Sequence, residues 1–205
     1  MDSEAVVKEV FSLYETYGDV DYIGEAVTQR QHALQAARFA EEEEFPAEII
    51  LGALLHDVGH LAGMRDGSER MTTNDVTLGA ANHDVIGAEY LARLGFPPAV
   101  TAFVRYHVQA KRFLVATDAG YYETLTEASR MTLDHQGGPM TEEEARTFAQ
   151  DPQFDVILRM RRWDERAKDP EAVTPPLEHY KDMCLRFLQE SEAAAAAAGE
   201  AGKKI

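Results

Sequence analysis

The stretch LLHDVGHLAG, Leu54 to Gly63, places two histidines and an aspartate inside an otherwise apolar run. Burying such groups is costly unless partners compensate them, and a bound metal ion is the strongest compensation. The structural alternative is a histidine satisfied by a backbone carbonyl and an aspartate that caps a neighbouring helix. The stretch therefore predicts either a metal-binding segment or a core helix whose polar groups are satisfied locally.

Apolar residues recur at helical spacing along most of the chain, and no strand-like alternation is sustained. The spacing predicts helices over 3–17, 29–44, 46–60, 77–94, 97–112, 118–131, 141–149, 151–167 and 176–198. The polar stretch MRDGSERMTTNDVT, residues 64–77, is expected to form a surface loop. The predicted fold class is therefore all-α. We expect a single domain over 1–190 and an Ala-rich tail over 191–205, which has high helix propensity but little to bury.

Composition disfavours several classes of partner. A formal net charge of −16 would repel nucleic acid and anionic membranes. The single cysteine, Cys184, allows no internal disulfide and fits a reducing cytoplasm. The first residues do not have the pattern of a signal peptide, and no run approaches the roughly 20 apolar residues that span a bilayer. We therefore expect a cytoplasmic protein with neither a nucleic-acid nor a membrane partner.

Six residues with metal-ligand chemistry lie at separate points of the predicted helices: His32, His56, Asp57, His83, His107 and Asp164. His32 and His56 are 24 residues apart, as are His83 and His107, an interval that suits two antiparallel helices and a turn. Imidazoles combined with carboxylates suit iron, manganese or zinc. Because a carboxylate can bridge two cations, Asp57 is predicted to join two metal ions.

This ordered set resembles the HD-domain superfamily, whose helical bundle holds one or two metals with the pattern H…HD…D and, in binuclear members, two more histidines. From about Tyr22 to Asp164 the pattern looks like the small mixed-valent diiron oxygenases related to myo-inositol oxygenase, and most like those that cleave organophosphonates. In that group a Tyr-x-x-Glu precedes the first histidine, as in DYIGEAVTQRQH. A lysine follows the last histidine by four positions, as in YHVQAK, and an arginine precedes the final aspartate by three, as in RRWD.

The resemblance implies a role for each of these residues. The iron that meets substrate would have two histidine and two carboxylate ligands: His32, His56, Asp57 and Asp164. The second iron would share the bridging aspartate and add two histidines: Asp57, His83 and His107. Four further side chains would grip the phosphonate: His60, Lys111, Ser129 and Arg161. Tyr22 and Glu25 would form a lid, in which Tyr22 covers the open iron position and Glu25 pairs with a cation of the substrate.

Helical spacing supports part of this assignment independently. His107 and Lys111 are i,i+4 neighbours, so the lysine ammonium reaches an anion bound beside the metal. Arg161 and Asp164 are i,i+3 neighbours, and a guanidinium matches the oxygens of a phosphonate.

The grip and lid residues other than His60 each have an ordinary explanation as well. Lys111 could be a solvated surface lysine and Ser129 a plain helix serine. Arg161 could form a surface pair with Asp155 or Glu165. The lid pair could be a core-edge aromatic and a solvated acid. Two histidines in polar or loop contexts are assigned no role in the site: His135 and His179.

The activity implied by the resemblance is that of an Fe(II)/Fe(III) oxygenase with O2 as co-substrate. It would cleave the C–P bond of 1-hydroxy-2-(trimethylammonio)ethylphosphonate or 2-amino-1-hydroxyethylphosphonate, releasing phosphate with glycine betaine or glycine. An upstream Fe(II)/2-oxoglutarate hydroxylase would supply this substrate. Two alternatives stay open: a metal-dependent HD phosphohydrolase of a nucleotide or phosphate monoester, and a regulatory HD module that binds a phosphorylated ligand without turnover.

Overall fold

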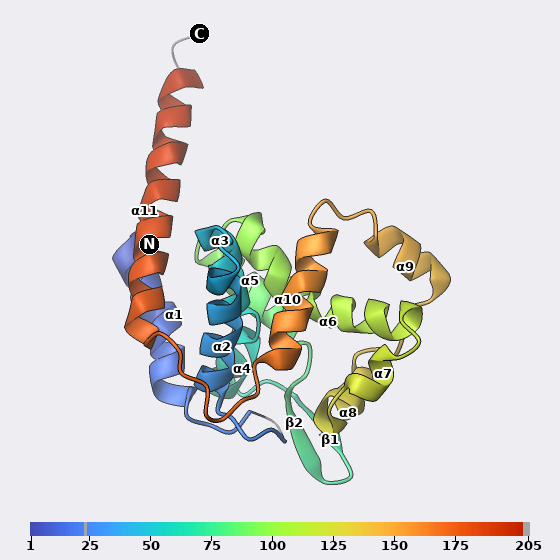
Figure 1. The fold of residues 1–205 in the computed structure, drawn as a ribbon. Coiled ribbons are helices and arrows are strands. Elements are labelled where there is room, and N and C mark those ends of the chain that lie inside the picture. Colours follow the sequence, from blue (N-terminus) through green and yellow to red (C-terminus); the bar gives the residue numbers. More distant parts are fainter. Residues whose placement is uncertain (23, 203–205) are drawn as a thin grey trace.

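Helices supply almost all of the regular structure (Figure 1). The computed structural model describes residues 1–22 and 24–202, with side-chain surroundings as far as residue 197. Its elements in chain order are α1 (Ser3–Tyr17), α2 (Gln29–Glu42), α3 (Ala47–Leu55), α4 (Val58–Asp66), β1 (Arg70–Thr73), β2 (Val76–Ala80), α5 (His83–Arg93), α6 (Pro98–Thr117), α7 (Tyr121–Thr124), α8 (Glu127–His135), α9 (Glu142–Phe148), α10 (Phe154–Arg166) and α11 (Leu177–Gly202). The all-α prediction is confirmed.

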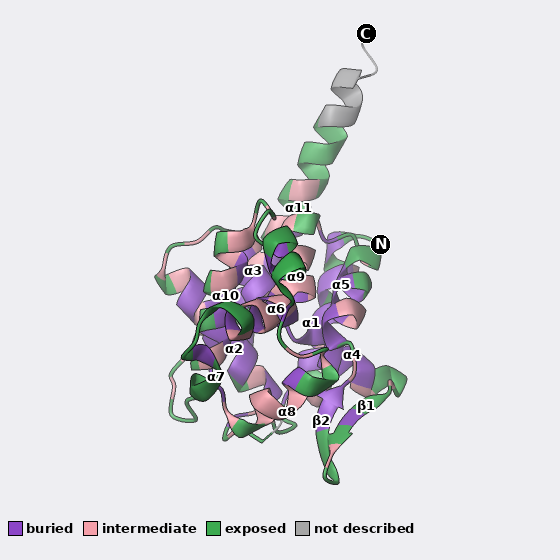
Figure 2. Cartoon of the chain, turned by 90° about the vertical axis from the view of Figure 1, so that its right-hand side faces the viewer, coloured by how far each residue is buried: buried purple, intermediate pink, exposed green. Residues whose placement is uncertain are grey.

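The core is built by helices that are distant in the chain. α2 packs on α3, α4 packs on α5, and α3, α5 and α10 all pack on α6. Large side chains such as Leu54, Phe103 and Trp163 are fully buried between them. Figure 2 shows the buried residues on the inner faces of these helices and the exposed ones on the loops and outer ends. The long helix α6 is therefore the central element against which the others assemble.

Two glycines let α4 and α5 approach closely. A Cβ built on Gly59 would lie 1.8 Å from the carbonyl oxygen of His83, and one on Gly87 would lie 2.9 Å from the backbone nitrogen of Gly59. No side chain fits between the two backbones at this point. The first residue of α5, His83, consequently lies directly beside the turn that carries Asp57.

The helix expected over 46–60 is interrupted, and that prediction is wrong at its centre. α3 ends at Leu55 and α4 begins at Val58, with Asp57 at φ −102° and ψ 10°. This backbone conformation lies near the sparsely populated bridge region in which many active-site residues are found. Apolar residues continue on both sides of the break, so helical periodicity does not reveal it.

The surface loop expected over 64–77 is instead an antiparallel hairpin of β1 and β2. Its turn residues, Asn74 and Asp75, have φ values of 50° and 65°, as a tight two-residue hairpin turn requires. Each strand is too short for a period of two to stand out in the sequence. The predicted fold thus lacked this small sheet.

The helix expected over 77–94 is also wrong at its start, because α5 begins only at His83. Residues 76–80 belong to β2, and Gly79 and Asn82 adopt positive φ values of 91° and 53°. These two residues turn the chain from the hairpin into the helix. The late start leaves His83 at the open first turn of α5.

Two further predicted helices differ in extent. The helix expected over 97–112 continues to Thr117 as α6. The helix expected over 118–131 is split into α7 and α8, because Leu125 is extended and the hydroxyl of Thr126 caps α8 by accepting a hydrogen bond from the backbone nitrogen of Ser129. Capping hydroxyls end one helix and start the next without changing the apolar pattern. The other predicted helices match α1, α2, α9, α10 and α11 apart from their ends.

The C-terminal helix α11 runs away from the bundle (Figures 1 and 2). It packs against α1 and α3 near its start, whereas residues 192–197 are exposed. Residues 203–205 of the predicted tail lie outside the described residues. Although α11 is long, none of the helices in the described part of the chain is sufficiently apolar over such a length to cross a membrane.

Candidate metal centre

Six buried side chains converge where α2, the α3–α4 turn, α5, α6 and α10 meet. They are the six predicted metal ligands, none of which is more than 7% exposed: His32, His56, Asp57, His83, His107 and Asp164. Their ligand atoms form two groups, each lying within 4.8 Å: His32, His56 and Asp164 in one, and Asp57, His83 and His107 in the other. The chain thus brings together residues that are separated by more than half of its length.

Asp57 lies between the two groups and faces each of them with a different oxygen. Its Oδ2 lies 3.3 Å from His56 Nε2 and 3.6 Å from His32 Nε2. Its Oδ1 lies 3.2 Å from His107 Nε2 and 3.4 Å from His83 Nε2. This is the arrangement that a carboxylate needs to bridge two metal ions.

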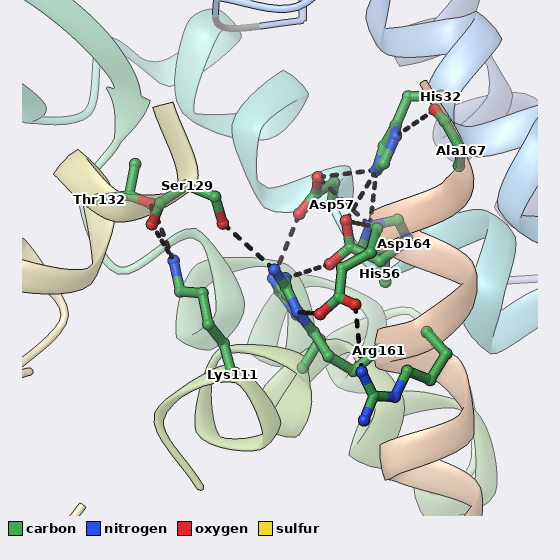
Figure 3. A network of polar contacts seen from close by, with 12 residues as sticks. His32, His56, Asp57, Lys111, Ser129, Thr132, Arg161, Asp164 and Ala167 are labelled. Atoms are coloured by element: carbon green, nitrogen blue, oxygen red, sulfur yellow. Dashed lines mark hydrogen bonds and ion pairs between the residues drawn. The ribbon is translucent and has the colours of Figure 1, made fainter. Parts of the chain in front are cut away.

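The backbone fixes the tautomers of the first histidine pair (Figure 3). His32 Nδ1 lies 2.9 Å from the carbonyl oxygen of Ala167, and His56 Nδ1 lies 2.8 Å from that of Ala53. Because a carbonyl only accepts hydrogen bonds, each Nδ1 of the neutral rings carries the proton and each Nε2 presents a lone pair. The two Nε2 atoms face one another at 3.1 Å. Two lone pairs at this distance repel unless a proton or a metal ion lies between them, so the pair fits a metal ion.

The second histidine pair has a similar arrangement. His107 Nδ1 lies 2.8 Å from the carbonyl oxygen of Val104, and its Nε2 lies 2.9 Å from His83 Nε2. Within the described residues, the buried Nδ1 of His83 has no hydrogen-bond partner. Backbone carbonyls that orient ligand imidazoles are a common support of metal sites.

The electrostatics of the cluster favour bound cations. Burial alone would raise the pKa of Asp57, but the imidazoles of His56 and His107 hold it well below its usual range. Burial would also raise the pKa of Asp164, yet the Arg161 guanidinium and nearby imidazoles lower it well below that of a free aspartate. For His56, burial opposes protonation, but the two carboxylates raise the pKa to about 9, so a metal ion bound at its Nε2 would displace a proton. Both carboxylates are therefore ionised at neutral pH.

A cavity of about 50 Å³ lies against the cluster. All the residues predicted to grip or cover a substrate line it: Tyr22, Glu25, His60, Lys111, Ser129 and Arg161. Three polar lining residues were not predicted: Thr132, Gln136 and Lys168. Thr132 lies three positions after Ser129 on α8, so helical spacing could have indicated it. Lys168 lies beyond α10, and nothing in its local sequence distinguishes it from a surface lysine.

Lys111 projects from α6 towards α8 (Figure 3). Its ammonium donates to Thr132 Oγ1 at 2.8 Å and to the carbonyl oxygen of Ser129 at 3.2 Å. With 3% exposure it is not the solvated lysine of the alternative explanation. Burial, followed by the nearby Arg161, lowers the pKa of Lys111 to about 7. A bound dianion would therefore favour the charged form of this lysine.

Arg161 joins the metal cluster to α8. Its Nη1 donates to Asp164 Oδ2 at 2.5 Å, and its Nη2 donates to Ser129 Oγ at 3.2 Å. Its Nε donates to Glu165 Oε1 at 3.0 Å, so the Glu165 contact of the alternative explanation also exists. Arg161 is only 5% exposed, however, and this is no surface pair. The guanidinium lies between a predicted metal ligand and the serine side of the cavity.

His60 is held by the hairpin. Its Nδ1 accepts a hydrogen bond from the backbone nitrogen of Ala80 at 3.0 Å, and its ring stacks on His83 with centroids 3.8 Å apart. Burial lowers the pKa of His60 to about 4, so the ring is neutral at pH 7. With Nδ1 accepting, the proton lies on Nε2. His60 is therefore preset as a hydrogen-bond donor.

A tight turn before α2 carries the predicted lid. The ring of Tyr22 stacks on His32 with centroids 3.9 Å apart and an interplanar angle of 13°. The backbone nitrogen of Tyr22 donates to Val27 O, that of Glu25 donates to Tyr22 O, and Gly24 has a φ of 71°. Burial, and then the charge of Asp57, raise the pKa of Tyr22 well above its usual value. Tyr22 therefore presents a neutral phenol beside the candidate metal centre.

The two histidines that were assigned no role in the site make contacts elsewhere. His135 Nε2 lies 2.7 Å from Thr73 Oγ1 of the hairpin, and His179 Nε2 lies 2.8 Å from Glu41 Oε1. Neither residue lines the cavity at the cluster.

The all-α bundle and its two adjoining His/Asp groups place the protein among helical proteins whose core could hold a dinuclear metal site. The HD domain model matches residues 30–174, and the chain belongs to the HD-domain family, whose members depend on metals. Both predictions, the HD-domain fold and the family, are confirmed.

Three relatives each align with 90% of the chain. The [1-hydroxy-2-(trimethylamino)ethyl]phosphonate dioxygenase (glycine-betaine-forming) of Leisingera caerulea is 39% identical, with 91% of its own length covered. The hydroxymethylphosphonate dioxygenase of Gimesia maris is 38% identical, with 89% covered. The uncharacterized protein L432 of Acanthamoeba polyphaga mimivirus is 38% identical, with 83% covered. The resemblance to phosphonate-cleaving oxygenases is thereby confirmed.

Proposed function

We propose that the protein is an O2-dependent diiron dioxygenase that cleaves the C–P bond of a 1-hydroxyalkylphosphonate with a cationic nitrogen at C2. The candidate substrates are 1-hydroxy-2-(trimethylammonio)ethylphosphonate, which would give glycine betaine, and 2-amino-1-hydroxyethylphosphonate, which would give glycine. Two relatives named as phosphonate dioxygenases, at 38% and 39% identity over most of the chain, support this proposal. The observation that carries it is the position of Asp57: each of its oxygens faces one histidine pair, next to a cavity lined by the buried side chains of Lys111 and Arg161.

The proposed centre has two iron ions in the Fe(II)/Fe(III) state. One ion would be held by His32, His56, Asp57 and Asp164, and the other by Asp57, His83 and His107. When bound, this pair of ions supplies the activation of O2 that side chains cannot provide. The donor set of imidazoles and carboxylates, with no thiolate, suits iron.

The proposed reaction balances without an added reductant. The C1–H and C1–P bonds of the substrate break, and O2 accepts the four electrons that are released. One oxygen atom enters the new carboxylate, and the other enters phosphate. A cation at C2 takes no part in this balance, so it serves recognition only.

The side chains around the cavity would bind and orient the substrate. Lys111 and Arg161 supply positive charge for the phosphonate, and a guanidinium matches its oxygens with two parallel donors. Ser129 and the Nε2–H of His60 supply neutral donors. Tyr22, stacked on His32, would exclude water from the substrate position. Glu25 would pair with the cationic nitrogen.

The C1 hydroxyl has to be introduced before this enzyme acts. We propose an Fe(II)/2-oxoglutarate hydroxylase as the upstream enzyme and the cytoplasm as the location of both. The catalytic domain would comprise residues 1–190, with the tail over 191–205 outside the active unit.

The decisive experiment compares phosphate release with and without O2. The iron-loaded protein should release phosphate from the hydroxylated phosphonate in air, with equimolar O2 uptake, and should release none under anaerobic conditions. Phosphate release that persists without O2, or with Mn²⁺ or Co²⁺ on a nucleotide or phosphate monoester, would instead identify a phosphohydrolase. Tight binding of a phosphorylated ligand with no turnover under either condition would identify a regulatory module.

A further inference from the structure

Glu25 of the lid already has a cationic partner within the chain. The ammonium of Lys168 lies 2.7 Å from Glu25 Oε1, and both side chains are largely covered, with 15% and 12% exposure. A second acceptor, Thr126 Oγ1, lies 3.3 Å from the same ammonium. The carboxylate that would attract a substrate cation is therefore neutralised before any substrate arrives.

The backbone around Lys168 is fixed on both sides. The carbonyl oxygen of the preceding residue, Ala167, accepts the Nδ1 hydrogen of His32. The following residue, Asp169, is held by Gln35, which donates to its carbonyl at 2.9 Å and accepts from its nitrogen at 3.1 Å. Lys168 consequently cannot retreat from Glu25 by a shift of its backbone, and only its side chain can move.

We infer that Lys168 is a specificity-determining residue, an internal cation that competes with the cationic nitrogen of the substrate for Glu25. This inference rests on the proposed function. Specificity depends on the difference between two binding free energies, and an internal competitor lowers that difference for charged ligands without affecting uncharged ones. When a substrate cation displaces it, the Lys168 ammonium keeps Thr126 as an acceptor and regains water at its exposed edge.

The competition reduces the dependence of binding affinity on the charge of the C2 substituent. With Lys168 in place, a ligand with a trimethylammonium group gains only the part of the Glu25 attraction that exceeds the lost ion pair. A ligand with no charge at C2 leaves the ion pair intact. Lys168 thus allows a site with an acidic lid residue to accept both kinds of phosphonate.

The test compares two ligands of matched shape that differ in one charge, 2-(trimethylammonio)ethylphosphonate and 3,3-dimethylbutylphosphonate. Neither has the C1 hydroxyl, so neither is consumed, and titration calorimetry of the iron-loaded protein under anaerobic conditions gives their dissociation constants. In Lys168→Met, the ratio of the two constants should move about 3- to 10-fold in favour of the charged ligand, as expected for a partly covered ion pair. The ratio cancels any loosening of the lid, because that affects both ligands equally.

Two variants provide controls. Lys181→Met removes an ammonium that pairs with Glu15 at 2.9 Å on the exposed surface, and it should leave the ratio unchanged. In a Glu25→Gln background, Lys168→Met should change the ratio less than about twofold, since the contested carboxylate is gone.

An equal change for both ligands in Lys168→Met, or a full effect in the absence of Glu25, would overturn the inference. These outcomes are independent of turnover. If instead the protein releases no phosphate from any hydroxylated phosphonate in air, the proposed function fails, whatever the binding ratio.

Discussion

Asp164 accepts a hydrogen bond from Arg161 Nη1 at Oδ2, while its Oδ1 lies 3.4 Å from His32 Nε2. One carboxylate therefore connects a histidine of the first candidate metal group with an arginine that lines the adjoining cavity. In the proposed enzyme, Asp164 would couple the binding of the phosphonate to the orientation of a metal ligand. Arg161 and Asp164 are spaced i,i+3 on α10, so one helical turn sets the distance between the guanidinium and the carboxylate.

Arg161→Lys should weaken phosphonate binding more than metal binding. A lysine keeps the charge but cannot contact Asp164 and a phosphonate oxygen with one planar group, so the dissociation constant should rise about 10- to 100-fold. Calorimetry with a non-hydroxylated phosphonate measures this change, and elemental analysis should still find two irons per chain. Arg162→Lys, on the exposed side of α10, is the matched control. Loss of both irons in Arg161→Lys would contradict its placement as an anion-binding residue.

Asp57→Ala should remove both metal ions, because the His83–His107 group loses its carboxylate and the His32–His56 group loses the bridging oxygen and keeps only Asp164. Elemental analysis of protein purified with iron would measure less than about one ion per chain, whereas an exposed control such as Asp155→Ala should retain two. A variant that keeps two irons without Asp57 would show that the two sites are independent of a bridging carboxylate.

The binding of phosphonate should depend on pH through Lys111. Its pKa is lowered to about 7 and the bound dianion favours the protonated form, so this contribution is present below pH 7 and is lost as the pH rises through that value. Lys111→Arg stays charged throughout. From pH 7 to pH 9, wild-type binding should weaken about 10-fold or more relative to Lys111→Arg.

Calorimetric titrations of the wild type and Lys111→Arg in the same buffers give the ratio of their dissociation constants. The ionisation of the ligand affects both proteins equally, so it cancels in this ratio. A ratio that stays constant from pH 6 to pH 9 would mean that Lys111 does not titrate in this range.

Gly59→Ala should destabilise the fold and disturb the second metal group. The new methyl group would meet the carbonyl oxygen of His83 at 1.8 Å, and overpacking of this kind costs about 1–3 kcal/mol or more. Urea unfolding of the metal-free protein measures the loss of stability. Gly120→Ala is the matched control, since its nearest neighbour would be 4.0 Å away, and it should unfold close to wild type.

The convergence of the six candidate ligands could be predicted from the sequence, because most of them lie on the buried faces of amphipathic helices. His32, His107 and Asp164 each occupy a buried face whose position follows from helical periodicity. The break at the His56–Asp57 dipeptide could not be predicted, since it changes the direction of the chain without changing the apolar pattern. Periodicity reports which face of an element is buried and is silent on where the element bends.

The hairpin and the ion pair of Glu25 escaped prediction for a different reason. The strands are short, and their regularity depends on a turn at Asn74 and Asp75 that carries no glycine. The contact between Glu25 and Lys168 joins residues separated by most of the chain. Such contacts depend on the packing of α10 on α2, and no local signal encodes them.

The hydrogen bond from the backbone nitrogen of Ala80 to His60 Nδ1 lets the hairpin determine which nitrogen of the imidazole carries the proton. The register of the hairpin places a backbone N–H, and not a carbonyl, against the Nδ1 atom, and this contact leaves the imidazole hydrogen on Nε2. A slip of one residue along β2 would reverse that polarity. The alignment of the two strands therefore sets which nitrogen of a ring in the cavity wall carries hydrogen.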